Sequence, residues 1–287
     1  MSSQQCRACG SSDSELLFQI GENRVARCSG CSHVFLDIVH TPESIRKMYE
    51  GYENPGNDFY FERIDDEVNA HFDGYLQRCR EYCKTGAASP RILDIGCGNG
   101  SLLARAKKMG FTCEGIETNE PLAETVRKKL DCAVHSKLLS DCTFPGETFD
   151  VVTMYDLIEH LQDPIDDLHR VHSWLKPGGV LFVLTPNDDA LLRRVARLAY
   201  RMSLRMVHRP MHTLYYPHHL SYFTAQSLRS LFEGIGLDVA WIETRNQEMS
   251  RLNVSGMDRL AVSLIFAASR PFPGSGGKLL AWARRRS

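Results

Sequence analysis

The stretch that most constrains this 287-residue chain is Arg91–Ser101, in which three glycines alternate with other residues after a short apolar run. Ile92–Ile95 has the character of a buried strand, and Ser101–Met109 has that of a helix. A strand, a glycine turn and a helix N-terminus together make a place where a ligand can approach bare backbone. The sequence therefore predicts a ligand-binding turn within an α/β unit.

Short apolar runs alternate with helical stretches from residue 91 onward. This alternation predicts an α/β domain with a parallel sheet and helices on both faces, and ligands bind at the carboxyl ends of the strands in such sheets. The expected strands are 91–95, 112–117, 132–135, 149–154, 179–185, 237–243 and 278–284. The expected helices are near 101–109, 120–130, 163–175 and 224–236.

The spacing of the glycines separates two kinds of nucleotide site. A dinucleotide fold has Gly-x-Gly-x-x-Gly, whereas Gly96, Gly98 and Gly100 follow Gly-x-Gly-x-Gly, two residues after Asp94. An acid at that position repels a pyrophosphate and suits a ligand with a cationic end. Glu117, at the tip of the second strand, is placed to bind both hydroxyls of a ribose.

This block resembles motif I of the class I S-adenosylmethionine-dependent methyltransferases, Asp-x-Gly-x-Gly-x-Gly. Phe149–His160, ending in Glu-His, and Leu175–Val183, containing Leu-x-Pro-Gly-Gly, are similar to later motifs of the same superfamily. The resemblance implies a Rossmann-like, seven-stranded, mostly parallel sheet whose last strand is inserted antiparallel, with S-adenosyl-L-methionine as cofactor. It also implies a set of cofactor-binding residues: Asp94, Gly96, Cys97, Gly98, Glu117, Thr118, Asn119, Lys137, Leu138 and Tyr155.

Several titratable residues compete for the role of general base. The candidates are Asp156, Glu159, His160, His218 and His219. Because His titrates near neutral pH, we expect His219 or His160 to be the base, with His219 ahead because its loop closes over the acceptor in many relatives.

A catalytic metal is the alternative. Asp156, Glu159 and His160 are spaced i, i+3, i+4, which places them on one face of a helical turn. Some quinone-pathway O-methyltransferases carry Glu-x-x-Glu-His here and use it for a divalent metal. This chain has Asp at the first position, so the alternative stays open.

Four cysteines near the N-terminus, Cys6, Cys9, Cys28 and Cys31, form two Cys-x2-Cys pairs separated by eighteen residues. Four thiolates at this spacing, around a segment with hairpin character, fit a structural Zn²⁺ in a small zinc ribbon. His33 is expected to be a neighbour of this site and not a ligand. A zinc ribbon joined to this kind of domain resembles bacterial methyltransferases that act on sugars and other small metabolites.

The chain is expected to divide into a zinc ribbon over 1–41, a helical linker or lid over 42–89, and the methyltransferase domain over 90–287. Ile64–Cys83 predicts an amphipathic helix within the linker. The linker also contains an aromatic cluster that can either pack the ribbon onto the main domain or cover the ligand: Tyr49, Tyr52, Phe59, Tyr60 and Phe61.

The composition of the chain limits which partners and which cellular location we expect. The net charge of −1 gives no global electrostatic case for nucleic acid, and no apolar run approaches the ~20 residues that span a bilayer. The N-terminus has no apolar signal segment, and ten cysteines without one point to metal or free thiols. We therefore expect a cytoplasmic protein.

An arginine-rich segment, Ala190–Arg209, forms a basic helical insertion near 190–210. Its arginines are expected on one side of a helix, with Leu192, Val195, Ala199, Met202 and Met206 on the other. Such a helix can contact the inner face of a membrane or a lipid-linked substrate, or its arginines can pair with acids elsewhere.

These patterns together predict an enzyme that methylates a small-molecule acceptor, at a hydroxyl of a sugar, a lipid-linked intermediate or a similar metabolite. The alternative is an RNA base methyltransferase with a zinc-ribbon RNA-binding module, against which the near-zero net charge argues. A non-enzymatic interaction module is the least favoured, because the glycine block and Glu117 are intact.

Overall fold

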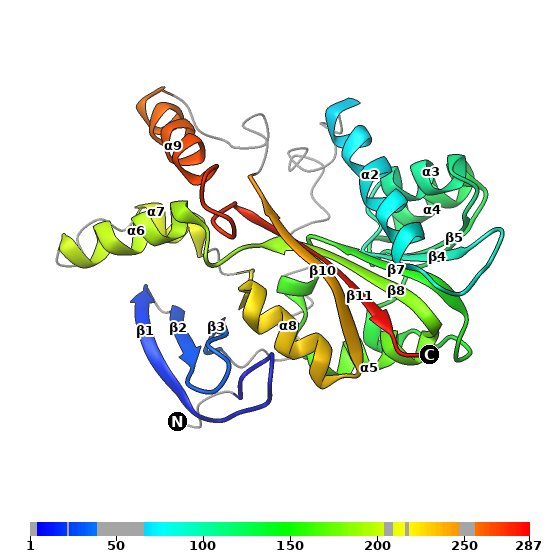
Figure 1. Ribbon diagram of the computed structural model, residues 1–287, viewed down its shortest axis with the longest axis horizontal. Coiled ribbons are helices and arrows are strands. Elements are labelled where there is room, and N and C mark those ends of the chain that lie inside the picture. Colours follow the sequence, from blue (N-terminus) through cyan, green and yellow to red (C-terminus); the bar gives the residue numbers. More distant parts are fainter. Residues whose placement is uncertain (1–4, 22, 39–65, 204–208, 216–217, 247–255) are drawn as a thin grey trace.

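The computed structural model describes residues 5–21, 23–38, 66–203, 209–215, 218–246 and 256–287. Within these residues, a seven-stranded sheet has the order β10-β11-β8-β7-β4-β5-β6 (Figure 1). Its strands are β4 (Arg91–Ile95), β5 (Thr112–Ile116), β6 (Ala133–His135), β7 (Phe149–Tyr155), β8 (Leu175–Pro186), β10 (Leu237–Arg245) and β11 (Lys278–Arg285). The predicted fold class is confirmed.

Strand β4 lies at the point where the strand order reverses. It pairs in parallel with β5 on one side and with β7 on the other. The chain runs outward from β4 through β5 to β6, and then returns to β7 and β8 on the opposite side. The carboxyl ends of two diverging strands leave a crevice at such a switch point, which is where open α/β sheets bind ligands.

Strand β11 is inserted antiparallel between β8 and β10, as the family resemblance implied. Lys278, its first residue, pairs with Pro186 at the carboxyl end of β8. The last strand therefore brings a residue from the end of the chain to the edge where β4 and β7 finish.

Successive residues of a strand point to opposite sides of the sheet, so apolar strands give the sheet two apolar faces. Helices cover both of these faces. On one face, Ile92 packs in a core formed with α2 (Asp66–Tyr82), α3 (Ser101–Lys108) and α4 (Glu120–Leu130). On the other face, Leu93 packs in a core formed with α5 (Pro164–Trp174) and α8 (Ala225–Gly234). Figure 1 shows the two groups on opposite sides of the sheet.

A second, four-stranded antiparallel sheet has the order β1-β2-β3-β9. β1 (Ser14–Ile20) and β2 (Asn23–Cys28) form the expected hairpin, and β3 (Val34–Leu36) follows the second cysteine pair. The fourth strand, β9 (Ser221–Tyr222), comes from the other end of the chain and was not predicted. The N-terminal strands and the C-terminal part of the chain are thus joined through one sheet.

The main departure from the predicted boundaries is at β8, which begins at Leu175 and not at residue 179. Its first residue pairs with Phe149, and the register then shifts before Val151 pairs with Val180. Gly178 in this irregular stretch has a φ of 78°, which explains why the Pro-Gly-Gly sequence reads as a turn.

Helix α2 lies where Ile64–Cys83 was expected to be helical. The aromatic cluster of the linker lies outside the described residues. Figure 1 shows α6 (Leu191–Met202), α7 (Arg209–Leu214) and α9 (Gly256–Ser269) extending away from the seven-stranded sheet. None of the described helices combines the length and apolar character needed to cross a bilayer.

Candidate functional site

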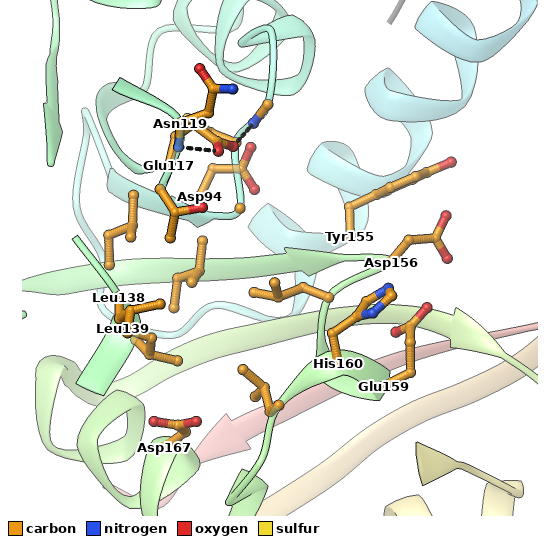
Figure 2. Close-up of a pocket in the computed structure, with 18 of the residues that line it drawn as sticks. Asp94, Glu117, Asn119, Leu138, Leu139, Tyr155, Asp156, Glu159, His160 and Asp167 are labelled. Carbon is orange, nitrogen blue, oxygen red and sulfur yellow. Dashed lines mark hydrogen bonds between the residues drawn. The ribbon is translucent and has the colours of Figure 1, made fainter. Parts of the chain in front are cut away.

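A cavity of about 600 Å³ opens at the carboxyl ends of β4, β5 and β7 (Figure 2). All ten residues predicted to bind the cofactor line this cavity: Asp94, Gly96, Cys97, Gly98, Glu117, Thr118, Asn119, Lys137, Leu138 and Tyr155. Four of the five candidates for the general base, Asp156, Glu159, His160 and His219, line it as well. The volume is that of a typical small-molecule site.

The glycine turn after β4 has a backbone that only glycine adopts without strain. Gly96, Gly98 and Gly100 have φ values of 73°, 51° and 76°. A Cβ on Gly100 would also lie 2.8 Å from a methyl group of Val126, on helix α4. Two requirements, left-handed backbone and close helix packing, therefore fix glycine at position 100.

Glu117 is held by the backbone on both sides of it. One carboxylate oxygen accepts a hydrogen bond from the Gly98 N–H at 2.9 Å, and the other accepts one from the Asn119 N–H at 2.9 Å. Asn119 in turn caps helix α4, because its side chain accepts from the Leu122 N–H at 3.0 Å. The carboxylate that is expected to bind a ribose is therefore fixed in place, and it joins the turn after β4 to the start of α4 (Figure 2).

Asp94 is the buried acid of the glycine block, with 3% of its surface exposed. Its carboxylate accepts a hydrogen bond from the Thr153 hydroxyl at 2.6 Å. Burial raises its pKa to about 7, and the nearby carboxylate of Glu117 adds to this. A cation that enters the cavity beside Asp94 lowers this pKa again, so its binding favours release of a proton.

Apolar and aromatic side chains line two parts of the cavity. Leu138 is 39% exposed although it is apolar, and it lies beside Leu139 in the segment after β6. Phe72 of α2 meets Tyr155 edge to face, with ring centroids 5.3 Å apart, and both residues line the cavity. Such surfaces suit the flat face of an aromatic base or ring.

His160 and His219 come together at the end of the cavity beyond Tyr155. Their rings lie edge to face with centroids 4.8 Å apart. The Nδ1 of His160 is 2.9 Å from the carbonyl oxygen of His218, which makes Nδ1 the donor and leaves Nε2 as the acceptor of the neutral ring. His218 thus contacts His160 through its carbonyl group, and a catalytic role for its side chain stays a prediction.

Burial keeps both imidazoles neutral. It lowers the pKa of His160, and it lowers the pKa of His219 well below the ordinary 6.5. For His219, the neighbouring His160, Arg193 and Lys278 act in the same direction. At neutral pH both rings can therefore accept a proton.

Glu159 is 1% exposed and lies next to this pair. One carboxyl oxygen accepts a hydrogen bond from the Thr185 hydroxyl at 2.9 Å, while the other, Oε1, has no hydrogen-bond partner among the described residues. Burial, followed by the charge of Asp156, raises its pKa to about 8. The group is therefore mainly protonated at neutral pH.

The expected grouping of Asp156, Glu159 and His160 on one helical turn is wrong in part. Asp156 has a φ of 50°, and the short 3₁₀ helix η3 spans only Ile158–His160. Asp156 instead forms an ion pair with Lys278. Ligand atoms of Glu159, His160 and His219 all lie within 4.8 Å of one another, so His219 replaces Asp156 in the group that is close enough to share a metal ion.

Sequence reasoning missed several residues that line the cavity. Lys278 begins strand β11, 95 residues after the last of the motifs, and only the antiparallel insertion brings it here. Asp163, Asp166 and Asp167 come from the start of α5, and burial raises the pKa of Asp167 to about 7. The Asp163-Pro pair signals only a helix start, since Asp163 caps α5, and carries no functional pattern.

The four N-terminal cysteines converge as predicted. The sulfur atoms of Cys6 and Cys31 are 3.6 Å apart, as are those of Cys9 and Cys28. All four lie within 4.8 Å of one another. Four ligands at about 2.3 Å from a tetrahedral Zn²⁺ are separated by about 3.8 Å, so the arrangement fits such an ion.

His33, two residues after the last cysteine of the cluster, is fully buried, and its ring contacts residues outside the cysteine cluster. Its Nδ1 lies 3.4 Å from the Ser227 hydroxyl, and its ring packs on Phe223 with centroids 4.6 Å apart. The expectation that it is not a metal ligand agrees with this placement.

In the described part of the arginine-rich segment, α6, some arginines make contacts within the protein. In α6, Arg193 is buried, and Arg197 pairs with the buried Asp188 at 2.8 Å. On the predicted apolar side, Val195 and Met202 are exposed. Three of the arginines, Arg193, Arg194 and Arg197, thus pair with acids of the protein. Contact with a membrane or a lipid-linked substrate stays a prediction.

Comparisons with known proteins agree with this geometry. A family model described as "Methyltransferase domain" matches residues 59–240. The ubiquinone biosynthesis O-methyltransferase of Pseudomonas aeruginosa is 31% identical over 136 residues, which cover 45% of this chain and 58% of that protein. The enzyme of the same name from Hydrogenovibrio crunogenus is 31% identical over 173 residues, which cover 57% of this chain and 72% of that protein.

Solved structures share the fold. A methyltransferase from Archaeoglobus fulgidus, described as SAM-dependent, superposes with a TM-score of 0.53 at 22% identity, covering 79% of this chain and 97% of that one. A Bacillus halodurans protein superposes with a TM-score of 0.53 at 14% identity, covering 76% of this chain and all of that one. At these identities the likeness concerns the fold alone.

Proposed function

This chain belongs to the methyltransferase domain family, and we propose that it transfers the methyl group of S-adenosylmethionine to a hydroxyl group of a small-molecule acceptor. The observation that carries the proposal is the meeting of Asp94, the glycine turn and Glu117 at one strand edge. Asp94 suits the cationic amino group of the methionine moiety, and Glu117 suits the ribose hydroxyls. Leu138 and Lys137 border the place left for the adenine.

The cavity divides into two ends that match the two substrates. The cofactor residues of β4 and β5 form one end, and Glu159 and His160 form the other, beyond Tyr155 (Figure 2). His219 lines the cavity as well and its ring contacts that of His160. Because the methyl group leaves a sulfonium ion, the sulfur needs no protonation, and the protein has to align the acceptor and remove its proton. We assign the removal of the acceptor's proton to His219, with His160 as the second candidate.

The hydroxyl acceptor is supported by the relatives named ubiquinone biosynthesis O-methyltransferase. Two neutral imidazoles at the acceptor end are suited to a hydroxyl, which is a poor nucleophile until a base shares its proton. RNA base methylation is the weaker candidate, since the net charge is −1. An untargeted screen for product labelled from methyl-labelled S-adenosylmethionine tests the proposal, and labelled RNA without labelled small molecules would contradict it.

We expect the affinity for S-adenosylmethionine to depend on Asp94. Its pKa of about 7 in the free protein must fall when the cationic ligand binds, so affinity is highest above pH 7 and declines as Asp94 becomes protonated. Between pH 7.5 and pH 6 the dissociation constant should rise roughly eightfold, with proton release measured by calorimetry in buffers of different ionisation enthalpy. The Asp94→Asn variant should bind more weakly and lose this pH dependence. An unchanged affinity from pH 7.5 to 6 would argue against the role given to Asp94.

We also propose that Cys6, Cys9, Cys28 and Cys31 hold one structural Zn²⁺. All four tetrahedral positions are then filled by thiolates, so the ion stabilises the N-terminal module and takes no part in methyl transfer. Metal analysis of the purified protein should find one equivalent of zinc. Cys28→Ser should unfold the module and leave cofactor binding largely intact. An ordered module in metal-free protein would refute this assignment.

A further inference from the structure

The segment that carries His219 is fixed by the N-terminal module. Its next residue, Leu220, accepts a hydrogen bond from the Leu36 N–H of β3 at 3.0 Å. The Leu220 N–H donates to the carbonyl oxygen of Glu159 at 2.8 Å. One residue therefore links the module on one side to the acceptor end of the cavity on the other.

The pairing continues after Leu220. Strand β9 pairs antiparallel with β3, with Val34 opposite Tyr222 and Phe35 opposite Ser221. Strand β9 has only two residues, and so short a strand is not stable without a partner strand. The edge of β3 supports this chain on one side, while Phe223, directly after β9, pairs with Asn187 and accepts a hydrogen bond from the Asp188 N–H at 2.8 Å.

The same edge is joined to the cysteine cluster. The Cys28 N–H donates to the carbonyl oxygen of His33 at 2.9 Å, directly before β3 begins. His33 then packs on Phe223, directly after β9. A continuous set of contacts thus leads from the cysteine cluster through β3 to the segment that carries His219.

The module makes a second contact with the cavity lining, two residues after η3. The guanidinium group of Arg7, between the first two cysteines, donates to the carbonyl oxygen of Gln162, and Gln162 lines the cavity. Arg7 is 5% exposed and also donates to the Ile38 carbonyl at 3.2 Å. The module therefore touches the acceptor end through two separate segments, whereas the cofactor end is built from the turns after β4 and β5.

We propose that the cysteine module is part of the acceptor half of the active site, with the Leu36 N–H and Arg7 as positioning groups that hold the His219 segment and the cavity rim in place. The inference rests on the proposed function, because it gives the module a purpose in methyl transfer. It separates the two halves of the site: damage to the β3–β9 contact should disorder the His219 segment and spare cofactor binding.

The test compares Leu36→Pro with Leu36→Val in the full-length protein. Proline and valine each have three side-chain carbons, but only proline lacks the backbone N–H that donates to the carbonyl oxygen of Leu220. Leu36→Pro should accelerate amide exchange over residues 218–224 at least tenfold relative to Leu36→Val, because this segment loses its link to β3. The dissociation constant for S-adenosylmethionine, measured by calorimetry, should stay within twofold in both variants.

A second readout reports on His219 itself. Its imidazole signal in NMR is identified by its absence from the His219→Gln variant. In Leu36→Pro its pKa should rise toward the ordinary 6.5, because the ring is released from burial, whereas Leu36→Val should keep the lowered value. Equal exchange rates and equal pKa values in the two variants would overturn the inference.

Removal of metal gives an independent arm if Leu36→Pro fails to fold. A chelator added to the wild-type protein should accelerate exchange over 218–224 while exchange in β4 and binding of S-adenosylmethionine persist. Unchanged exchange over 218–224 after loss of zinc would overturn the inference. Failure of the wild-type protein to bind S-adenosylmethionine would instead contradict the proposed function, which distinguishes the two.

Discussion

Replacement of His219 by Gln is expected to lower turnover by roughly 10²–10⁴-fold, because a hydroxyl acceptor reacts slowly without a base. The affinity for S-adenosylmethionine should remain nearly unchanged, since the cofactor residues lie at the other end of the cavity. Turnover is measured with the acceptor that the product screen identifies, and affinity by calorimetry. A loss in turnover with constant cofactor affinity assigns the effect to the transfer step.

The dependence of turnover on pH gives a second test of His219 as the base. Burial lowers the pKa of His219 well below 6.5, so the base stays neutral and competent at neutral pH. Turnover should therefore decline only when the pH falls below the range of an ordinary imidazole. His160→Gln is the matched comparison, since the two rings share one contact. If both variants keep full turnover, the base hypothesis is wrong, and alignment alone or a metal on Glu159 must carry the reaction.

Replacement of Glu117 by Ala is expected to weaken binding of S-adenosylmethionine by about 1–3 kcal/mol, which is roughly 5–150-fold. The variant loses the hydrogen bonds to the ribose and also those that Glu117 accepts from Gly98 and Asn119. Calorimetry measures the loss. Glu117→Gln keeps one acceptor oxygen, so its affinity for S-adenosylmethionine should fall between those of the wild-type protein and Glu117→Ala. An unchanged affinity in Glu117→Ala would exclude Glu117 from the cofactor site.

The cofactor end of the site could be predicted because its chemistry is local. Asp94, the glycines and Glu117 lie within 24 residues of one another, each at the end of a strand that the apolar pattern already defines. Parallel strands end at the same edge, so the residues that follow them meet there. All ten predicted residues line the cavity for this reason.

The acceptor end could not be predicted in the same way because it is assembled from distant segments. Lys278 reaches Asp156 only through the antiparallel insertion of β11, and no local pattern signals this pair. Asp156 has a left-handed backbone, which the helical spacing of the sequence did not suggest. The two-residue strand β9 is too short to leave a periodic pattern, so its pairing with β3 was invisible as well.

Calorimetric titration of the purified full-length protein with S-adenosylmethionine shows whether the cavity binds this cofactor. We expect binding of one equivalent in the range of roughly 1–100 μM, as for typical enzyme ligands. We also expect weaker binding in Glu117→Ala, and no comparable binding of NAD, because Asp94 repels a pyrophosphate. Preference for NAD, or S-adenosylmethionine binding that is indifferent to Glu117, would contradict the account.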